Sequence, residues 1–228
     1  PIHTPVPRAF DGPDVDVIDA DGGLVVPGLI DIHSDHIERM TAPRPSSIMD
    51  FNVALHETER ELMIHGITTM YHSLSFNDAG AFRPSHIRNP HYTRRFLELI
   101  SDFRRDGHLI HHRFHARFEI SSIHRLPELT RYIEHGLVHL LSLTDHTPGQ
   151  GQYHDVEMYR KTMKGYRDLS ESELDRIVME RQAQEKLGSD ALRALVSTAH
   201  EHGVSVASHD DDTLEKLELN CELGVDIS

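Results

Sequence analysis

Cysteine is almost absent from this chain, and long apolar runs are absent altogether. The one cysteine, Cys221, excludes an internal disulfide and a cysteine-rich zinc site. Scarce cysteine is typical of a reducing compartment, so we expect a cytoplasmic protein. No apolar run reaches the roughly 18 residues that a membrane-spanning helix needs, and we expect no membrane partner.

Basic residues are also few. The chain of 228 residues has 23 Lys and Arg against 37 Asp and Glu, which gives a net charge of −14. This balance argues against a nucleic-acid-binding surface. Histidine, by contrast, occurs 20 times, and we expect most of these residues on the surface or on helices. The pair His111-His112 is too short for a metal-storage tract.

The stretch from Val26 to His36 is the most informative part of the sequence. Its apolar residues end in a group of His and Asp, as a buried strand does when it carries metal ligands at its carboxyl end. Because strand side chains alternate between faces, we expect His33 and Asp35 to share one face. An imidazole beside a carboxylate suits Zn, Mn or Fe. The pattern indicates a metallohydrolase.

The same arrangement recurs along the chain. Helix-like stretches end in Gly66, Gly107, Gly136 and Gly203, and each is followed by an apolar run that ends in polar residues. This alternation predicts parallel βα units, with five complete strands and a sixth that begins at Val225. An open doubly wound sheet is compatible with the alternation alone. Chemistry at several strand ends favours a (β/α)8 barrel, which carries its active site at that end.

Polar and apolar residues alternate in the expected third strand. Phe114, Ala116 and Phe118 would pack beneath helices. The opposite face carries Arg113, His115, Arg117 and Glu119. Inward-facing charges are costly without partners; a wet, metal-bearing barrel mouth would supply them, as would a pair between Arg117 and Glu119. The alternative is an edge strand whose polar face meets solvent.

The length limits the architecture. A full (β/α)8 barrel needs about 250 residues, whereas this chain has 228, starts with Pro1 and stops within an apparent strand. We therefore expect part of a larger protein. Residues 1–24 would be the remnant of an accessory β-sandwich, and residues 25–228 a partial barrel domain. The unpaired sheet edge would need a cover, and we expect a homo-oligomer.

Capping residues mark the expected helices. Asp50 is placed to cap a helix over Phe51–His65. Ser170 has capping-box spacing and opens another helix. Ser189 would cap a third, over residues 190–202.

A long insertion follows the fourth expected strand. Two glycines, a proline and amide side chains come directly after Asp145 and His146. We interpret them as a flexible lid or phosphate-gripping loop over the metal site, with Gln150 as a substrate-binding residue. A plain connector is the alternative.

The stretch Val26–His33 resembles the first barrel strand of the amidohydrolase superfamily, which follows a small β-sandwich. Five runs, in order, resemble the phosphonate-metabolism diphosphatases of that superfamily. They are His33-Ser34-Asp35 with Pro43-Arg44-Pro45, Gly66–Thr69, His115–Glu119, Asp145–Gln150 and Ala207–Asp211. The resemblance runs from about residue 15 to the end of the chain.

This resemblance implies a metal-dependent TIM-type (β/α)8 barrel, truncated here to about five or six strands. It implies an enzyme that hydrolyses α-D-ribose 1-methylphosphonate 5-triphosphate and releases diphosphate, within the carbon–phosphorus lyase pathway.

The resemblance also implies a set of metal ligands. His33 and Asp35 stand where the superfamily has His-x-His, and Glu119 stands at the position of the bridging group. His146 and His209 match the single-histidine ligands of later strands. Together these residues would hold one or two divalent ions (Zn, Mn, Fe or Mg).

Three acidic residues are the candidate catalytic groups: Glu119, Asp145 and Asp211. The two aspartates are also the alternative ligands if the strand register differs by one residue. The superfamily has an Asp on its last strand that orients or deprotonates the attacking water. That residue would lie beyond Ser228, so we expect this fragment to be inactive by itself.

A small phosphorylated substrate needs cations, yet the chain is acidic. Arg44, Arg113 and Arg117 are the candidate substrate-binding residues, because a guanidinium fits phosphate oxygens in bidentate geometry. For each arginine the alternative is a structural salt bridge.

Two other functions stay open. One is a related metalloenzyme that cleaves a C–N bond in a cyclic amide or an amino-purine. The other is a non-catalytic fragment or interaction module with a vestigial metal site.

Overall fold

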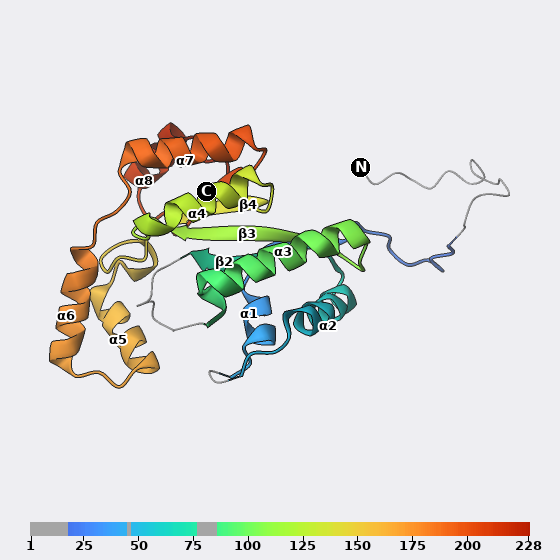
Figure 1. Cartoon of the computed structure of the whole chain (residues 1–228), viewed down its shortest axis with the longest axis horizontal. Coiled ribbons are helices and arrows are strands. Elements are labelled where there is room, and N and C mark those ends of the chain that lie inside the picture. The colour runs from blue at the N-terminus through green and yellow to red at the C-terminus, as the bar shows by residue number, and fades with distance from the viewer. Residues whose placement is uncertain (1–17, 45–46, 77–85) are drawn as a thin grey trace.

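The computed structural model describes residues 18–44, 47–76 and 86–228. Within these ranges, strands and helices alternate around one curled sheet (Figure 1). The strands are β1 (Leu29–Ser34), β2 (Ile67–Phe76), β3 (His111–Glu119), β4 (Leu140–Thr144) and β5 (Ser205–Ser208). The helices are α1 (His36–Thr41), α2 (Phe51–Ile64), α3 (Pro90–Asp106), α4 (Leu126–Glu134), α5 (Val156–Tyr166), α6 (Glu171–Gln182), α7 (Ser189–Glu201) and α8 (Leu214–Leu223). Short 3-10 turns are η1 (His86–Arg88), η2 (Ile123–Arg125) and η3 (Gly151–Tyr153).

The strand order settles the architecture of the sheet. All neighbouring strands pair in parallel, in the order β1-β2-β3-β4-β5. A doubly wound sheet reverses its strand order at a switch point, and this sheet does not. The predicted five parallel strands are therefore confirmed, and the curled sheet is consistent with a truncated (β/α) barrel.

The predicted sixth strand and the predicted β-sandwich remnant lie at the two ends of the chain. The predicted sixth strand is present as a single parallel bridge between Ala207 and Ile227, supported by the Ser208 N–H, which donates to the Ile227 carbonyl at 2.8 Å. The expected sandwich remnant falls mostly on residues 1–17, outside the described ranges. Residues 18–28 are exposed and carry no helix or strand, so the proposed domain boundary stays a prediction.

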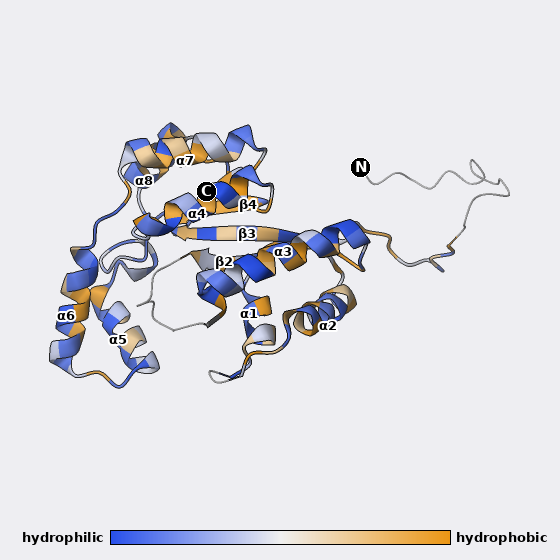
Figure 2. Ribbon diagram, viewed as in Figure 1, coloured by the Kyte–Doolittle hydropathy of each residue, from blue (hydrophilic) through white to orange (hydrophobic). Residues whose placement is uncertain are grey.

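The main core lies between the sheet and its outer helices. Phe114, Ala116 and Phe118 on β3 are fully buried, as their alternation predicts. Phe114 meets Phe96 of α3 with ring centroids 6.3 Å apart. Burial of each large side chain contributes about 1.5–3 kcal/mol. Along α3 and α7, apolar residues alternate with polar ones, as helices with one buried side require (Figure 2).

Local capping explains where the helices begin. Asp50 accepts two backbone N–H bonds at the start of α2, and Ser170 forms a complete capping box at the start of α6; both predictions are confirmed. In α7 the expectation is wrong by one residue. Gly188, in extended backbone, is the N-cap, and Ser189 is already helical.

The insertion after β4 is a helical hairpin rather than a long flexible loop. A tight turn precedes η3 and is closed by the Gln150 N–H, which donates to the Thr147 carbonyl at 3.2 Å; the Gly149 N–H donates across η3 to the Tyr153 carbonyl at 2.8 Å. Helices α5 and α6 then pack through a small core of their own, separate from the main one. Its buried members are Tyr153, Tyr159, Met163, Leu174 and Val178. The hairpin lies at the end of the sheet to which β3 points (Figure 1).

A chain of buried polar groups ties α2 to the outer face of the sheet. His72 on β2 is fully buried, and its Nε2 lies 2.9 Å from Nδ1 of His112 on β3. Nε2 of His112 lies 3.3 Å from Oε1 of Glu59 on α2. Burial lowers the pKa of both histidines, that of His72 well below its usual value. The network is therefore neutral at its histidines and fixes the helix against β2 and β3.

Among the residues described, no helix combines the length and the apolar character needed to cross a membrane.

The close approach of Gly28 to β2 can be tested by substitution. A Cβ at this position would overlap the Thr68 side chain, including its Cβ. We expect Gly28→Ala to lower the free energy of unfolding by about 1–3 kcal/mol, as overpacking does, measured by chemical denaturation. Gly165→Ala is the matched control, because no atom lies within 4 Å of the added Cβ and Ala favours the helix. Equal stability of the two variants would contradict the close approach of β1 to β2.

Candidate functional site

Two ring contacts between histidines centre on His33, near the carboxyl end of β1. The ring of His33, on β1, faces that of His209, in the loop after β5, with centroids 4.7 Å apart. The ring of His115, on β3, lies 5.4 Å from that of His33. A side chain of the first strand is thus brought beside one from the loop that follows the last strand. His33 and His209 are two of the predicted metal ligands.

Local backbone contacts position His33. Its backbone N–H donates to Oδ1 of Asp31 at 2.9 Å. The strand then ends at Ser34, and Asp35 is the N-cap of α1, with no side-chain capping bond. The expected strand alternation therefore does not extend to Asp35. Burial, together with the charges of Arg117 and His209, lowers the pKa of His33, whereas Asp31 and Asp35 act in the opposite direction.

Glu119, at the end of β3, is engaged by His146 rather than by Arg117. One carboxylate oxygen accepts the His146 backbone N–H at 3.1 Å, and the other lies 2.6 Å from Nδ1 of the same residue. Thr144 also donates to this carboxylate, at 3.3 Å. A carboxylate can only accept, so Nδ1 of His146 carries the proton. The lone pair of Nε2 is left for another partner.

Arg117 is half-buried, and its Nε is a buried donor without a hydrogen-bond partner. Burial and the charge of Arg88 lower its pKa, whereas Asp35, Glu38 and Asp210 act in the opposite direction. An unsatisfied guanidinium in such surroundings is a binding group for an anion.

His115 was not predicted as a site residue. It is buried, its Nδ1 lies 2.9 Å from the Ile32 carbonyl, and its Nε2 lies 2.9 Å from the Ser142 hydroxyl. Burial, with the charge of His33, lowers the pKa of His115 to about 3. Strand alternation correctly places His115 on the inner face. Its contacts with β1 and β4 depend on the register of separate strands, which one sequence does not show.

The two candidate aspartates are occupied elsewhere. Asp145 binds Lys186 at 2.7 Å. Burial acts to raise the pKa of Asp145, but the hydrogen bonds from Lys186 and Thr147 outweigh it, so the pKa is lowered. Asp211 accepts from Ser228 at 2.7 Å, from Asn220 at 2.9 Å and from Ser208. Both carboxylates hold loops together at the rim.

Three predicted substrate-binding residues are not brought to the histidines by any described hydrogen bond or ion pair. Arg44 is exposed beside its backbone bridge to Ser47. Gln150 lies in the turn before η3 and makes only backbone hydrogen bonds. Arg113 pairs with Tyr71 in the first half of β3, six residues before Glu119, which is about 20 Å along a strand.

The predicted metal ligands do not form a ready-made centre. Across residues 18–44, 47–76 and 86–228, no three His, Cys, Asp or Glu side chains converge on a point where an ion could bind. The ligand set therefore stays a prediction.

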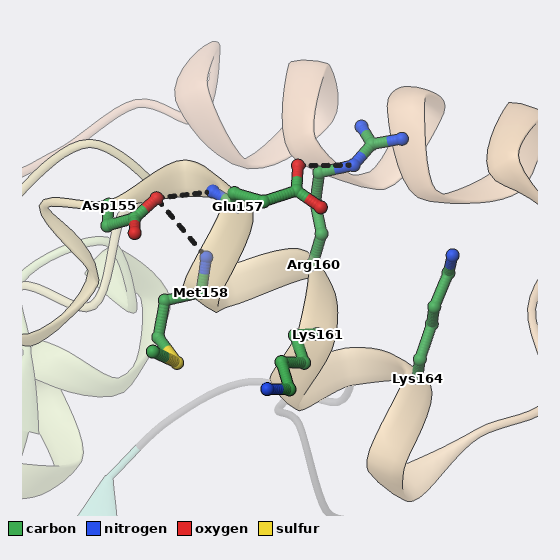
Figure 3. A pocket seen from close by; sticks show the side chains of 6 residues that line it. All are labelled: Asp155, Glu157, Met158, Arg160, Lys161 and Lys164. Carbon is green, nitrogen blue, oxygen red and sulfur yellow. Dashed lines mark hydrogen bonds and ion pairs between the residues drawn. The ribbon is translucent and has the colours of Figure 1, made fainter.

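A surface pocket elsewhere does not provide a cluster of unpaired basic side chains for a phosphorylated substrate. It runs along α5 and is lined by Asp155, Glu157, Met158, Arg160, Lys161 and Lys164 (Figure 3). Arg160 is paired with Glu157, Glu171 and Asp175, and Lys164 with Glu171. The pocket belongs to one helix and is balanced by carboxylates.

A half-barrel with histidines gathered at its carboxyl rim defines the general class of this chain: an α/β domain whose polar centre lies where (β/α) barrels hold their active sites. No family model matches the chain. The chain is 26% identical over 213 residues to the alpha-D-ribose 1-methylphosphonate 5-triphosphate diphosphatase of Escherichia coli (strain K12). The match covers 92% of this chain and 55% of that protein, so the chain spans about half the length of its relative. This supports a relationship to that diphosphatase and leaves membership of the amidohydrolase superfamily a prediction.

The depressed pKa of His115 gives a pH test of the site. The pKa of His115 is lower in the folded state than in the unfolded state, so on acidification the unfolded state binds a proton before the folded state does. The resulting stability is complete above about pH 6.5 and is lost as the pH falls. We expect the free energy of unfolding to fall less steeply in His115→Asn than in the wild type, by about 1 kcal/mol per pH unit between pH 6 and 5. Urea denaturation at several pH values measures the slopes. Parallel slopes would show that His115 is not held neutral.

Proposed function

We propose that this chain forms part of a metal-dependent hydrolase that releases diphosphate from α-D-ribose 1-methylphosphonate 5-triphosphate. The observation that carries the proposal is the facing pair His33 and His209 at the rim of the half-barrel. The similarity to a protein named for this reaction supports the choice of substrate. A small phosphorylated substrate, a cytoplasmic location and self-association belong to the same proposal.

The chemistry of the donors fits a divalent ion of the Zn, Mn, Fe or Mg type. Burial and neighbouring positive charge lower the pKa of His33 and His209, which favours the neutral imidazole that metals require. These two residues would hold the ion. Asp35 or Nε2 of His146 would supply a third ligand.

Glu119 has a different role in this proposal from that of a bridging ligand. Its carboxylate holds Nδ1 of His146, as carboxylates behind metal-bound histidines do. It thereby fixes the tautomer and the direction of the ring.

The metal ion and the remaining residues would have separate roles toward a phosphorylated substrate. A bound divalent ion would lower the pKa of water and stabilise phosphoryl oxygens. Arg117 supplies positive charge and free N–H donors beside the histidine pair. Lys186 keeps Asp145 ionised and holds it at the rim.

Metal content tests the proposal directly. We expect the purified protein, prepared with excess Zn²⁺ or Mn²⁺, to retain one to two equivalents by elemental analysis, and His209→Ala to retain clearly less. His135→Ala is the control, because His135 is exposed and its Nδ1 bonds to the backbone carbonyl of Arg131. Absence of metal from the wild type would favour the non-catalytic alternative.

Product release separates the remaining alternatives. The longest available form of the protein should release diphosphate from the ribose triphosphate. Release of ammonia or a carboxylic acid from cyclic amides or amino-purines, without diphosphate release, would replace the proposed reaction with C–N hydrolysis.

Arg117 is the residue to test for substrate binding. Loss of a charge-assisted hydrogen bond costs about 1.5–3 kcal/mol, so we expect Arg117→Met to raise KM or lower kcat/KM about 10- to 100-fold. Arg117→Lys should recover part of the loss, because it retains the charge without the planar fork. Arg131→Met, on the exposed side of α4, is the control. Unchanged kinetics in Arg117→Met would remove this residue from the substrate site.

A further inference from the structure

An irregularity in β1 lies directly before the rim. Asp31 pairs with Met70 and Ser34 with His72, so three steps on β1 run beside two steps on β2. The extra residue makes a bulge at Ile32 and His33. Bulges re-aim side chains near functional sites, and here the bulge carries His33.

The carbonyl of Ile32, inside this bulge, receives a hydrogen bond from a distant strand. Nδ1 of His115, on β3, lies 2.9 Å from it. Because a carbonyl can only accept, Nδ1 of His115 carries the proton. Nε2 must then accept from the Ser142 hydroxyl on β4, at 2.9 Å. The Ser73 hydroxyl on β2 lies 3.0 Å from Nδ1 and shares the same proton.

One buried imidazole thus spans four strands at the level of the bulge. The Asp31 carboxylate holds the His33 N–H from one side of the bulge, and His115 holds the Ile32 carbonyl from the other. With both contacts made, the His33 ring faces His209.

We infer that His115 is a positioning residue for His33: its Nδ1–H donor fixes the bulge that turns His33 toward His209. The inference deepens the proposed function and rests on it for the role of His33 as a metal ligand. The geometry of the bulge itself is independent of any metal.

Two substitutions distinguish positioning from simple packing. The side-chain amide of His115→Asn occupies the place of Nδ1 and can donate to Ile32. The amide of His115→Gln reaches the place of Nε2 and leaves the Ile32 carbonyl unpaired. Both variants remove the buried ring, so both should lower the melting temperature.

The first readout is the His33 imidazole in long-range ¹H–¹⁵N NMR spectra, assigned from its loss in His33→Gln. We expect His33 signals close to the wild type in His115→Asn and clearly shifted in His115→Gln. The second readout is titration with Co²⁺ alone, followed by its visible absorption. Co²⁺ affinity should fall about 10- to 100-fold in His115→Gln, as for residues that orient metal ligands, and should be largely restored in His115→Asn.

Equal effects of the two variants on His33, or no effect of either, would overturn the inference. If the wild type binds no Co²⁺ while His33 responds as expected, the proposed function fails and the positioning role stands. Should both variants fail to fold, the wild-type spectrum decides. A proton on Nδ1 of His115 supports the inference, and a proton on Nε2 overturns it.

Discussion

The whole arrangement depends on parallel pairing between strands that follow one another in the chain. Because all five strands run the same way, their carboxyl ends share one rim. The register then sets which side chains meet: Ser73 lies beside His115, and Glu119 lies beside Thr144. A slip of one residue would turn His115 and Arg117 toward the helices. The buried phenylalanines on the opposite face of β3 oppose such a slip.

Local charge at the rim differs from the charge of the whole chain. The protein is strongly acidic, yet several carboxylates around the histidines are already committed. Glu119 is held by His146, Asp145 by Lys186, and Asp211 by hydroxyl and amide groups. The Nε donor of Arg117 is left unmatched. Because these carboxylates are already paired, the rim repels a phosphate less strongly than the net charge of the chain suggests.

Much of the fold could be predicted from local patterns, and less of the site. Strand starts follow from glycine and apolar runs, and helix starts from Asp50 and Ser170. The position of Asp35 was missed because the bulge and the helix cap interrupt strand alternation. The pairing of Glu119 with His146 depends on a loop conformation, and the role of His115 on the register of four strands. Neither is encoded within a short stretch of sequence.

The α5–α6 hairpin has a small core that shares no buried residue with the main one. Stability is not uniform across a structure, and a segment with few buried apolar contacts can unfold locally at a lower free energy than the rest of the fold. The local stability of the hairpin and the stability of the half-barrel then depend on different buried residues. Substitutions at Tyr159 or Leu174 can therefore change the stability of the hairpin while the sheet and its histidines stay unchanged.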